Sequence, residues 1–324
     1  MGDNIKLTFL GDMMFGRYNY DENISSFADE LNYAKSKKFS PVAMRSFYGS
    51  IYDYINDNSD IVCGNLQTCI TNKTGRTKKT FNYRLDPEYS KILKFNSRQV
   101  YNLANNHIMD YGKNGIIETI NELDNLDINH VGAGINKLQS EEPVIIDIDD
   151  CRIGFLGATD QMLSWEAGSE KAGINILDYN DSEHTITQIK NLRKKCDVVV
   201  LNLHWGENWN SQPNEDQVKF SDQAFDAGAN IIIGTSSHFP HNLRIKDKNK
   251  IIIYGLGDFI DDYALNKYYR NDIGIVLHID CIDKGDGNVT LKDPVLMPIK
   301  ISNKSVNTVT NPLEGMMGLR FINL

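Results

Sequence analysis

Nearly continuous apolar runs, several of them rich in isoleucine, recur along this chain and stop at a glycine or a polar residue. Ile231–Ile233 stops at Gly234, Val198–Leu203 stops at His204, and Ile251–Tyr254 leads toward a Gly-Asp pair. Runs of this length without polar alternation are typical of strands buried on both faces of a sheet. The chain is therefore expected to fold around parallel strands that are covered by other layers on each side.

Segments with helical spacing alternate with these strands, as in an α/β protein. Residues 114–126 carry an apolar stripe on one side, and Gly228 is a helix stop. We predict one domain at residues 1–298, with antiparallel strands toward its end, and a tail at 299–324 that packs on it. Predicted helices are Ser46–Asn58, Glu88–Phe95, Asn114–Leu126, Ser182–Lys195 and Asp216–Ala227, and predicted strands include Ile5–Leu10, Asp60–Cys63, Gln99–Leu103, Ile128–Val131, Val144–Ile148, Ile153–Leu156 and Ile273–Ile279.

Composition excludes some classes of function. A net charge of −9 over 324 residues argues against a non-specific nucleic-acid binder, so we expect no nucleic acid partner. No apolar span of about 18 residues appears, and the first residues lack the pattern of a signal peptide. We therefore expect a cytoplasmic protein with no membrane anchor in this chain. The five cysteines include no C-x-x-C pair, which indicates buried thiols in a reducing compartment.

Polar residues with metal-binding side chains follow the predicted strands. The carboxyl ends of parallel strands meet at one edge of a sheet, where ligands bind. Asp, Asn and His side chains from separate strands are the donor set of hydrolases that use one or two divalent cations, and this set suits Mn, Zn, Fe or Co. The residues at the strand ends are Asp12, Asn65, Asn105, Asn106, His204, His238 and Asp258, with His241 close behind.

Simpler interpretations of these residues stay open at this point. Asn105 and Asn106 could cap the turn before the following helix, because Asn favours such positions. His238 and His241 could be hydrogen bonded to the backbone of their loop. The coincidence of so many donors at strand ends favours the metal site.

Six short motifs, in order, resemble the CapA family, the poly-γ-glutamate capsule-synthesis proteins related to calcineurin-like metallophosphoesterases. The resemblance covers roughly residues 5–280. It implies a calcineurin-like metallophosphoesterase fold, a four-layer α/β/β/α sandwich with metals at the strand ends. The motifs are GDMMFGR (Gly11–Arg17), GNLQT (Gly64–Thr68), LANNHIMDYG (Leu103–Gly112), HWGEN (His204–Asn208), HFPH (His238–His241) and YGLGDF (Tyr254–Phe259).

The resemblance also implies roles for individual residues. His107 stands where the phosphoesterases keep a catalytic acid, and Asp110 is placed to orient its imidazole. Two positions depart from the family pattern: Gln67 replaces a Glu, and Met14 stands where a D-x-H motif would have its histidine. These departures indicate one tightly held metal rather than two, or a different metal. The implied metal-site residues are Asp12, Gln67, Asn106, His204, His238 and His241.

Charged residues near the motifs are candidates for binding a substrate. An anionic substrate needs cations, and we single out Arg84, with Arg17 and Arg270 as weaker candidates. Asp258 stands where the family often has Asn, so it would either support the metals or receive a substrate cation. The basic loop at residues 71–80 is more often simply solvated.

Three functions are compatible with this sequence. The first is a metal-dependent, hydrolase-like enzyme that acts on a phosphorylated or carboxylate-rich substrate, with His107 as the proton donor. The second is a metal-dependent peptide Cα epimerase in ribosomal peptide maturation. The third is a non-catalytic accessory protein that handles a polyglutamate capsule polymer. The partner is accordingly a small molecule, a peptide or a polyanion.

Overall fold

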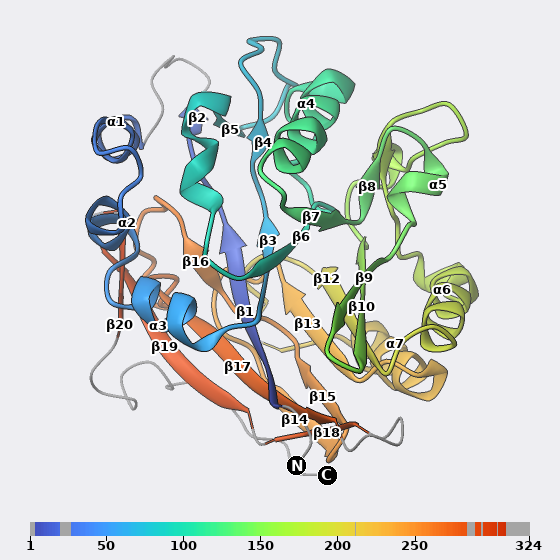
Figure 1. Cartoon of the computed structure of the whole chain (residues 1–324). Helices are drawn as coiled ribbons and strands as arrows, with labels where there is room; N and C mark the ends of the chain where they lie inside the picture. The colour runs from blue at the N-terminus through green and yellow to red at the C-terminus, as the bar shows by residue number, and fades with distance from the viewer. Residues whose placement is uncertain are drawn as a thin grey trace.

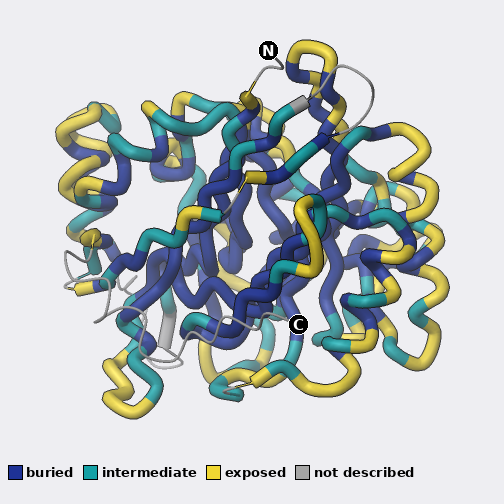
Figure 2. The backbone as a smooth tube through the Cα atoms, turned by 90° about the horizontal axis from the view of Figure 1, so that it is seen from below, coloured by how far each residue is buried: buried dark blue, intermediate teal, exposed yellow. Residues whose placement is uncertain are grey.

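Two mixed β-sheets pack face to face in this computed structural model, and helices cover their outer faces (Figure 1). The structure describes residues 4–19, 27–210, 212–283, 289–292, 294–302 and 304–308. Figure 2 shows the strands at the centre as the most buried part, with exposed residues in the peripheral helices and loops. The predicted α/β class and the four-layer α/β/β/α sandwich are confirmed.

The first sheet combines a parallel half with an antiparallel half. Its nine described strands are β20 (Ser305–Thr308), β19 (Val295–Ser302), β17 (Ile273–Asp283), β1 (Asn4–Met13), β3 (Ile61–Leu66), β6 (Arg98–Asn102) and β7 (Asn129–Val131) in this order, with β16 (Asp258–Ile260) beside β1 and β18 (Val289–Leu291) beside β17. Strands β1, β3, β6, β7 and β16 are parallel. Strands β17 to β20 pair antiparallel, as predicted for the end of the chain.

The second sheet has a parallel centre and antiparallel edge strands. Its six described strands are β14 (Leu243–Asp247), β15 (Lys250–Ile253), β13 (Ile231–Thr235), β12 (Val198–His204), β10 (Cys151–Thr159) and β9 (Val144–Ile148) in this order. The four central strands are parallel and buried on both faces, which explains their continuous apolar sequences. Two small sheets pair β8 (Ala133–Gly134) with β11 (Gly173–Ile174), and β5 (Phe81–Leu85) with β2 (Arg17–Asn19) and β4 (Cys69–Ile70).

Helices form the two outer layers. The first sheet packs against α1 (Ala28–Ser36), α2 (Pro41–Tyr48), α3 (Ile51–Asn58) and α4 (Gly112–Asn125), and the second against α6 (Glu183–Arg193) and α7 (Glu215–Ala227). Helix α7 begins with a reciprocal capping box between Asn214 and Gln217 and ends at Gly228, whose φ is +116°. Shorter helical segments are α5 (Lys137–Ser140), η1 (Pro87–Leu93), η2 (Leu163–Trp165) and η3 (Tyr179–Asp181).

The core between the sheets follows the two-residue period of the strands. Ile5, Leu7 and Phe9 of β1 point toward the second sheet, where they meet Val198 and Val200 of β12. Leu10 of β1 and the intervening residues of β12 belong to the clusters on the helix side instead. Each central strand therefore buries both of its faces.

A β-bulge near the end of β1 turns Asp12 toward the second sheet. The register between β1 and β3 shifts between Phe9 and Asp12, and Asp12 then pairs with Asn65. If side chains alternated strictly along β1 after Phe9, residue 11 rather than residue 12 would point toward the second sheet. The bulge thus decides which side of the sheet receives the carboxylate.

Some predicted element boundaries are wrong. The helix predicted at residues 46–58 is two helices, α2 and α3, because Gly49 takes a φ of +62° and ends the first. The helix predicted at residues 88–95 is the 3-10 helix η1. Strand β1 extends through Asp12 to Met13, and Asp258 begins β16 instead of following a strand.

Residues on both sides of the predicted domain boundary belong to one sheet. Residue 298 lies inside β19, and the described residues beyond it continue through β20. The remainder of the predicted tail, 309–324, lies outside the described residues, so the proposed division stays a prediction. All five cysteines fall within the described part of the chain; they are buried and no disulfide joins them, as expected.

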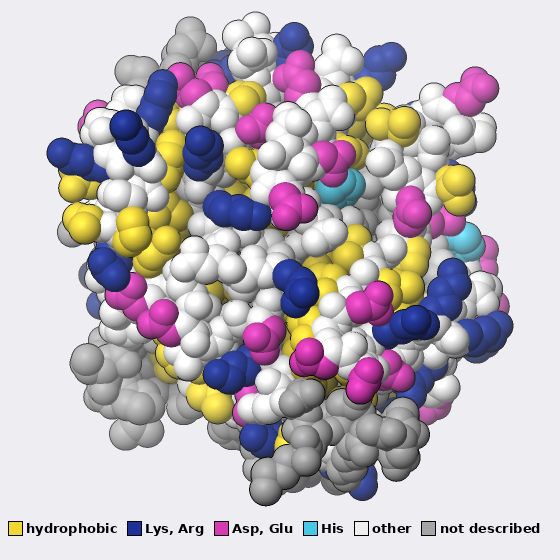
Figure 3. All heavy atoms as spheres, viewed as in Figure 1, with side chains coloured by type: hydrophobic (Ala, Val, Ile, Leu, Met, Phe, Trp, Pro, Cys, Tyr) yellow, Lys and Arg dark blue, Asp and Glu magenta, His cyan; other side chains and the backbone are white. Residues whose placement is uncertain are grey.

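The surface carries mixed charge. On the face seen in Figure 3, Lys and Arg side chains are interspersed with Asp and Glu. None of the helices in the described ranges has both the length and the apolar character needed to cross a bilayer.

The close approach at Gly11 yields a test of the fold. A Cβ at position 11 would lie 1.9 Å from the backbone oxygen of Gly257, which cannot move aside as a flexible side chain would. We expect Gly11→Ala to destabilise the protein by about 1–3 kcal/mol in chemical denaturation. Gly75→Ala is the control, because its Cβ would meet nothing within 4 Å, and it should change the stability by less than about 0.5 kcal/mol. Equal effects of the two substitutions would contradict the packing.

Candidate metal centre and histidine dyad

The inter-sheet core becomes polar where the parallel strands end. In each sheet, neighbouring strands carry a row of paired residues near their ends whose side chains point toward the other sheet. Earlier in the same strands, the side chains that point this way are apolar. Because both rows point between the sheets, their polar side chains meet. The rows are Asp258, Asp12, Asn65 and Asn102 in the first sheet, and Thr159, His204 and Thr235 in the second.

Asp12 is the centre of this polar region. Its Oδ1 atom accepts a hydrogen bond from Asn65 Nδ2 at 2.6 Å, and its Oδ2 atom accepts one from the backbone N–H of Ser236 at 3.0 Å. His204 Nδ1 lies 3.5 Å from Oδ1. Burial acts to raise the pKa of Asp12, but the contact with His204 and the nearby His238 outweigh burial and lower it. Asp12 is therefore a buried carboxylate that stays ionised.

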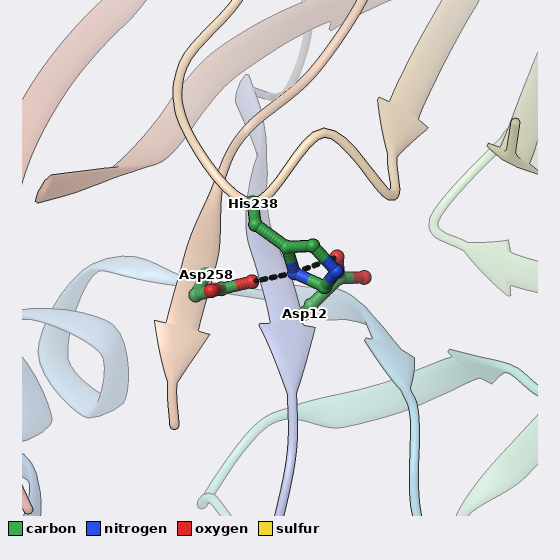
Figure 4. Close-up of side chains that lie close together, drawn as sticks. All are labelled: Asp12, His238 and Asp258. Carbon is green, nitrogen blue, oxygen red and sulfur yellow. Dashed lines mark hydrogen bonds and ion pairs between the residues drawn. The ribbon is translucent and has the colours of Figure 1, made fainter. Parts of the chain in front are cut away.

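Asp12, His238 and Asp258 form a buried cluster that fits a metal ion. One ligand atom from each of these three residues lies within 4.8 Å of the other two (Figure 4). His238 Nδ1 is 2.9 Å from Asp258 Oδ1 and 3.8 Å from Asp12 Oδ2. Among the described residues, Asp258 Oδ2 has no hydrogen-bond partner. A buried carboxyl oxygen left without a donor is costly, and a cation would satisfy it.

A third carboxyl group adds to the negative charge of the cluster. Burial raises the pKa of Asp258 well above its usual value, and the neighbouring charge of Asp12 acts in the same direction. Burial also raises the pKa of Asp261 well above its usual value, together with repulsion from Asp258. Without a cation, these two carboxyls hold on to protons. The donor set and its charge fit a divalent cation.

The loop after β13 holds His238 in a strained backbone conformation. His238 has a φ of +59° and Ser236 a φ of +94°, both in the left-handed region that non-glycine residues rarely adopt. The rings of Trp209 and Tyr263 pack around the imidazole at centroid distances of 5.3 and 5.1 Å. Burial lowers the pKa of His238, so the imidazole is neutral, the form that binds a metal. Strain at such a position is typical of functional sites.

Three other predicted ligands, Gln67, Asn106 and His204, lie together near the other carboxylate oxygen of Asp12, Oδ1. Gln67 Nε2 donates to Asn106 Oδ1 at 2.7 Å and lies 3.5 Å from His204 Nε2. His204 Nδ1 is 3.0 Å from Asn65 Nδ2 and 3.1 Å from Thr235 Oγ1. This side supplies amide and imidazole donors, whereas the carboxylates lie on the His238 side.

His107 and Asp110 form a dyad, as the sequence predicts. His107 Nδ1 is 2.7 Å from Asp110 Oδ2, which also accepts a hydrogen bond from the backbone N–H of Tyr83 at 2.8 Å. Lys79 Nζ donates to Asp110 Oδ1 at 2.7 Å and to the backbone oxygen of Asn106. Burial lowers the pKa of His107. The carboxylate is held by donors on both oxygens, so it fixes the orientation of the imidazole.

Asn65 and Asn105 connect the dyad to the metal cluster. Asn65 Nδ2 donates to Asp12, and Asn65 Oδ1 accepts from Asn105 Nδ2 at 3.3 Å. Asn105 Oδ1 accepts from the backbone N–H of His107 at 3.0 Å. Hydrogen bonds therefore run from Asp12 to His107 without interruption, and they fix the relative positions of the two groups.

Several predicted site residues lie apart from this network. His241 Nε2 is hydrogen bonded to the backbone oxygen of Asn210, and His241 is not a member of the three-residue cluster. Arg17 pairs with Asp262 at 3.3 Å. Arg84 donates to the backbone oxygen of Lys73 and Arg270 to the carboxylate of Asp272. The roles predicted for His241 and for the three arginines stay predictions.

Asp258, which is predicted to support the metals or to receive a substrate cation, lies against His238. This role stays a prediction. Sequence reasoning placed Asn65 at a strand end with the possible metal donors but did not include it among the implied metal-site residues. It also missed Lys79 and Asp261, for which no local pattern exists because only the fold brings them to the site.

Comparisons with known proteins agree with this architecture. The model of the family described as "Bacterial capsule synthesis protein PGA_cap" matches residues 6–263. The chain is 31% identical over 291 residues to capsule biosynthesis protein CapA of Bacillus anthracis, covering 85% of this chain and 66% of that protein. It is 30% identical over 322 residues to PGA biosynthesis protein CapA of Bacillus subtilis, covering 96% of this chain and 78% of that protein. The chain thus spans about two thirds to three quarters of these relatives.

Solved structures show the same fold. A putative 5'-nucleotidase from Staphylococcus aureus aligns with a TM-score of 0.50 and 13% sequence identity, covering 98% of this chain and 57% of that one. At this identity, the likeness shows the metallophosphoesterase-like fold alone.

Metal binding can be tested on the purified protein. We expect Mn²⁺ or Zn²⁺ at a hundredfold excess over its Kd to stabilise the fold by about 2.7 kcal/mol, because only the folded cluster binds it. Asp258→Asn should remove most of this stabilisation in thermal unfolding. Asp222→Asn is the control, because Asp222 pairs with Lys246 and Arg244 away from the cluster. An undiminished metal effect in Asp258→Asn would contradict the assignment.

The raised pKa of Asp261 predicts a pH dependence in the metal-free protein. A carboxyl whose pKa is higher in the folded than in the unfolded state destabilises the fold as pH rises above the unfolded value of about 3.9. Asp261→Asn in the presence of a chelator should therefore unfold at a higher temperature than the unsubstituted protein at pH 7. The difference should shrink as the pH is lowered toward 4. A difference independent of pH would show that folding does not shift the pKa of Asp261 and would contradict the raised value.

Proposed function

Because this chain belongs to the bacterial capsule synthesis (PGA_cap) family, we propose that it is a metal-dependent enzyme that hydrolyses a bond in an anionic, phosphorylated or carboxylate-rich substrate. One observation supports this most directly. A buried Asp/His/Asp cluster and a His–Asp dyad lie at the same end of the two sheets and are joined by hydrogen bonds through Asn65. A cation site beside a fixed proton donor is the arrangement that hydrolysis requires.

Asp12, His238 and Asp258 are the residues that would hold the cation. When bound there, a divalent cation supplies Lewis-acid stabilisation of negative charge on substrate oxygens and lowers the pKa of water. The three side chains are buried, so their electrostatic effect is less weakened by solvent.

His107 is the proposed proton donor to the leaving group. Its Nδ1 atom faces Asp110, which leaves Nε2 for the substrate. Hydrolysis adds a hydroxyl group from water to the electrophilic centre and a proton to the leaving atom. In its imidazolium form, which the Asp110 carboxylate stabilises, His107 supplies that proton from Nε2 and regains one from the attacking water, so the cycle balances.

Lys79 acts on this step through Asp110. Its ammonium group donates to Asp110 Oδ1 and to the backbone oxygen of Asn106, and it lies 3.2 Å from His107 Nδ1. These contacts occupy its donors, so Lys79 is a positioning residue rather than a substrate ligand. It keeps the carboxylate in the plane that the imidazole needs.

The names of the relatives indicate a biological context for the proposed reaction. The similar Bacillus proteins are named for capsule and PGA biosynthesis. By analogy, we propose that the substrate of this chain is connected with an anionic capsule polymer.

Substitution of His107 tests the proposed reaction. With added Mn²⁺ or Zn²⁺, we expect His107→Ala to lower kcat by about 10²- to 10⁴-fold on whichever aryl phosphate, phosphodiester or glutamate-rich substrate is turned over, because the general acid is lost. His184→Ala, at an exposed histidine paired with Glu141, should leave kcat unchanged. Metal content should be equal in both variants.

Two outcomes would count against hydrolysis. No turnover of any of these substrates at any metal concentration would remove the support for an enzyme. Deuterium incorporation at a peptide Cα in heavy water, without bond cleavage, would indicate the epimerase reaction instead.

A further inference from the structure

The turn that follows His204 connects three loops beside the metal cluster and has no role in the chemistry described above. It forms the second half of the HWGEN motif, residues 204–208. Gly206 in this turn has a φ of +77°. Both its N–H and its carbonyl oxygen are hydrogen bonded to residues that follow β10, so the turn belongs to a network rather than to solvent.

The end of β10 is joined to the backbone on both sides of Trp205. Thr159, the last residue of β10, donates from Oγ1 to the backbone oxygen of His204 at 2.6 Å. The N–H of Gly206 donates to both carboxylate oxygens of Asp160, at 3.1 and 2.9 Å. The hydroxyl of Tyr179 donates to Asp160 Oδ2 at 3.0 Å, which holds the carboxylate in place.

The side chain of Gln161 connects this turn to the loop that carries His238. Its Nε2 atom donates to the backbone oxygen of Gly206 at 2.7 Å and to Ser236 Oγ at 2.7 Å. A side-chain amide nitrogen carries two hydrogens, so both bonds form at once. The backbone N–H of Gln161 donates to Thr159 Oγ1 at 3.1 Å, which fixes Gln161 to the end of β10.

Ser236 passes this contact on to the metal cluster. Its backbone N–H donates to Asp12 Oδ2 at 3.0 Å, and its φ of +94° is one that serine rarely adopts. Its buried hydroxyl accepts from Gln161 and lies 3.3 Å from the backbone oxygen of Gly206. A strained conformation persists only where the surrounding contacts hold it. Here the contacts that hold it come from Gln161 and Gly206.

We propose that Gln161 is a positioning residue of the metal centre, whose side-chain amide holds the turn at Ser236 so that this N–H and the nearby imidazole of His238 face Asp12. The hydrogen bonds of Gln161 go to Thr159, Gly206 and Ser236, so it acts on the cation through the loop and not as a ligand. The inference rests on the proposed cation site but not on hydrolysis.

Calorimetric titration with Mn²⁺ tests the proposal. Gln161→Met keeps the length of the side chain, adds no charge and removes both N–H donors. We expect it to weaken Mn²⁺ binding about three- to tenfold, somewhat less than the loss of a group that contacts a metal ligand directly. Gln188→Met is the matched control, because Gln188 is also half-buried and its amide bonds with Asn175 beside α6. It should leave the Kd unchanged.

A double-substitution cycle locates the effect at Ser236. Ser236→Ala removes the oxygen that accepts from Gln161 and leaves the backbone N–H that donates to Asp12. Each single substitution should weaken Mn²⁺ binding, and the double variant should bind no more weakly than the weaker single variant. Fold-losses that multiply would show that the two residues act independently and would contradict the proposal.

Hydrogen exchange in the metal-free protein gives a readout that does not depend on the cation. In Gln161→Met, peptides that span Ser236 should exchange at least about fivefold faster than in the unsubstituted protein, because the turn opens locally. Peptides from α4 should exchange at an unchanged rate. Equally faster exchange in both regions would indicate a general stabilising role and would overturn the proposal.

The outcomes separate this inference from the proposed enzyme function. Equal Kd values for Gln161→Met and the unsubstituted protein, or unchanged exchange around Ser236, would overturn the role of Gln161 even if metal-dependent turnover is found. A selective loss of Mn²⁺ affinity in Gln161→Met without any turnover would leave this role standing and would remove the hydrolase. No Mn²⁺ binding by the unsubstituted protein would overturn the cation site and this inference with it.

Discussion

The carboxylate of Asp12 holds the two sheets together at their polar end. It accepts a hydrogen bond from Asn65 of its own sheet and another from the backbone of Ser236, which follows a strand of the second sheet. A fully buried carboxylate costs several kcal/mol unless donors surround it, and here the donors come from both layers. The positions of His204 and His238 depend on this contact, because both imidazoles face the same carboxylate.

Apolar runs made the layers predictable, because a strand covered on both faces must be apolar throughout. The edge on which the ligands gather was predictable too, since parallel strands end together. The sequence did not predict, however, which side of the sheet Asp12 faces. That depends on a bulge, and a single added residue leaves no mark on hydrophobic periodicity. The same holds for Lys79: its loop was predicted to be solvated, yet its half-buried side chain forms an ion pair with Asp110.

The distribution of charge around Asp12 differs from what the family resemblance implies. Position 67 carries Gln instead of Glu, and position 258 carries Asp where Asn is frequent. The negative charge therefore lies with His238 rather than with His204. A single cation placed between Asp12, His238 and Asp258 would be surrounded by two carboxylates. The amide side of Asp12 keeps neutral groups, which orient the neighbouring side chains through hydrogen bonds.

The hydrogen bonds distinguish the side chains that position the site from the buried atoms that remain available to a ligand. Along the path from Asp12 through Asn65 and Asn105 to His107, each linking oxygen has a donor. By contrast, Gln67 Oε1 and the Oδ2 atoms of Asp258 and Asp261 lack partners among the described residues. Unsatisfied buried polar atoms cost about 1–3 kcal/mol each, so selection for stability alone would remove them. These atoms lie around the cluster rather than along the path, where a bound ion or substrate would satisfy them.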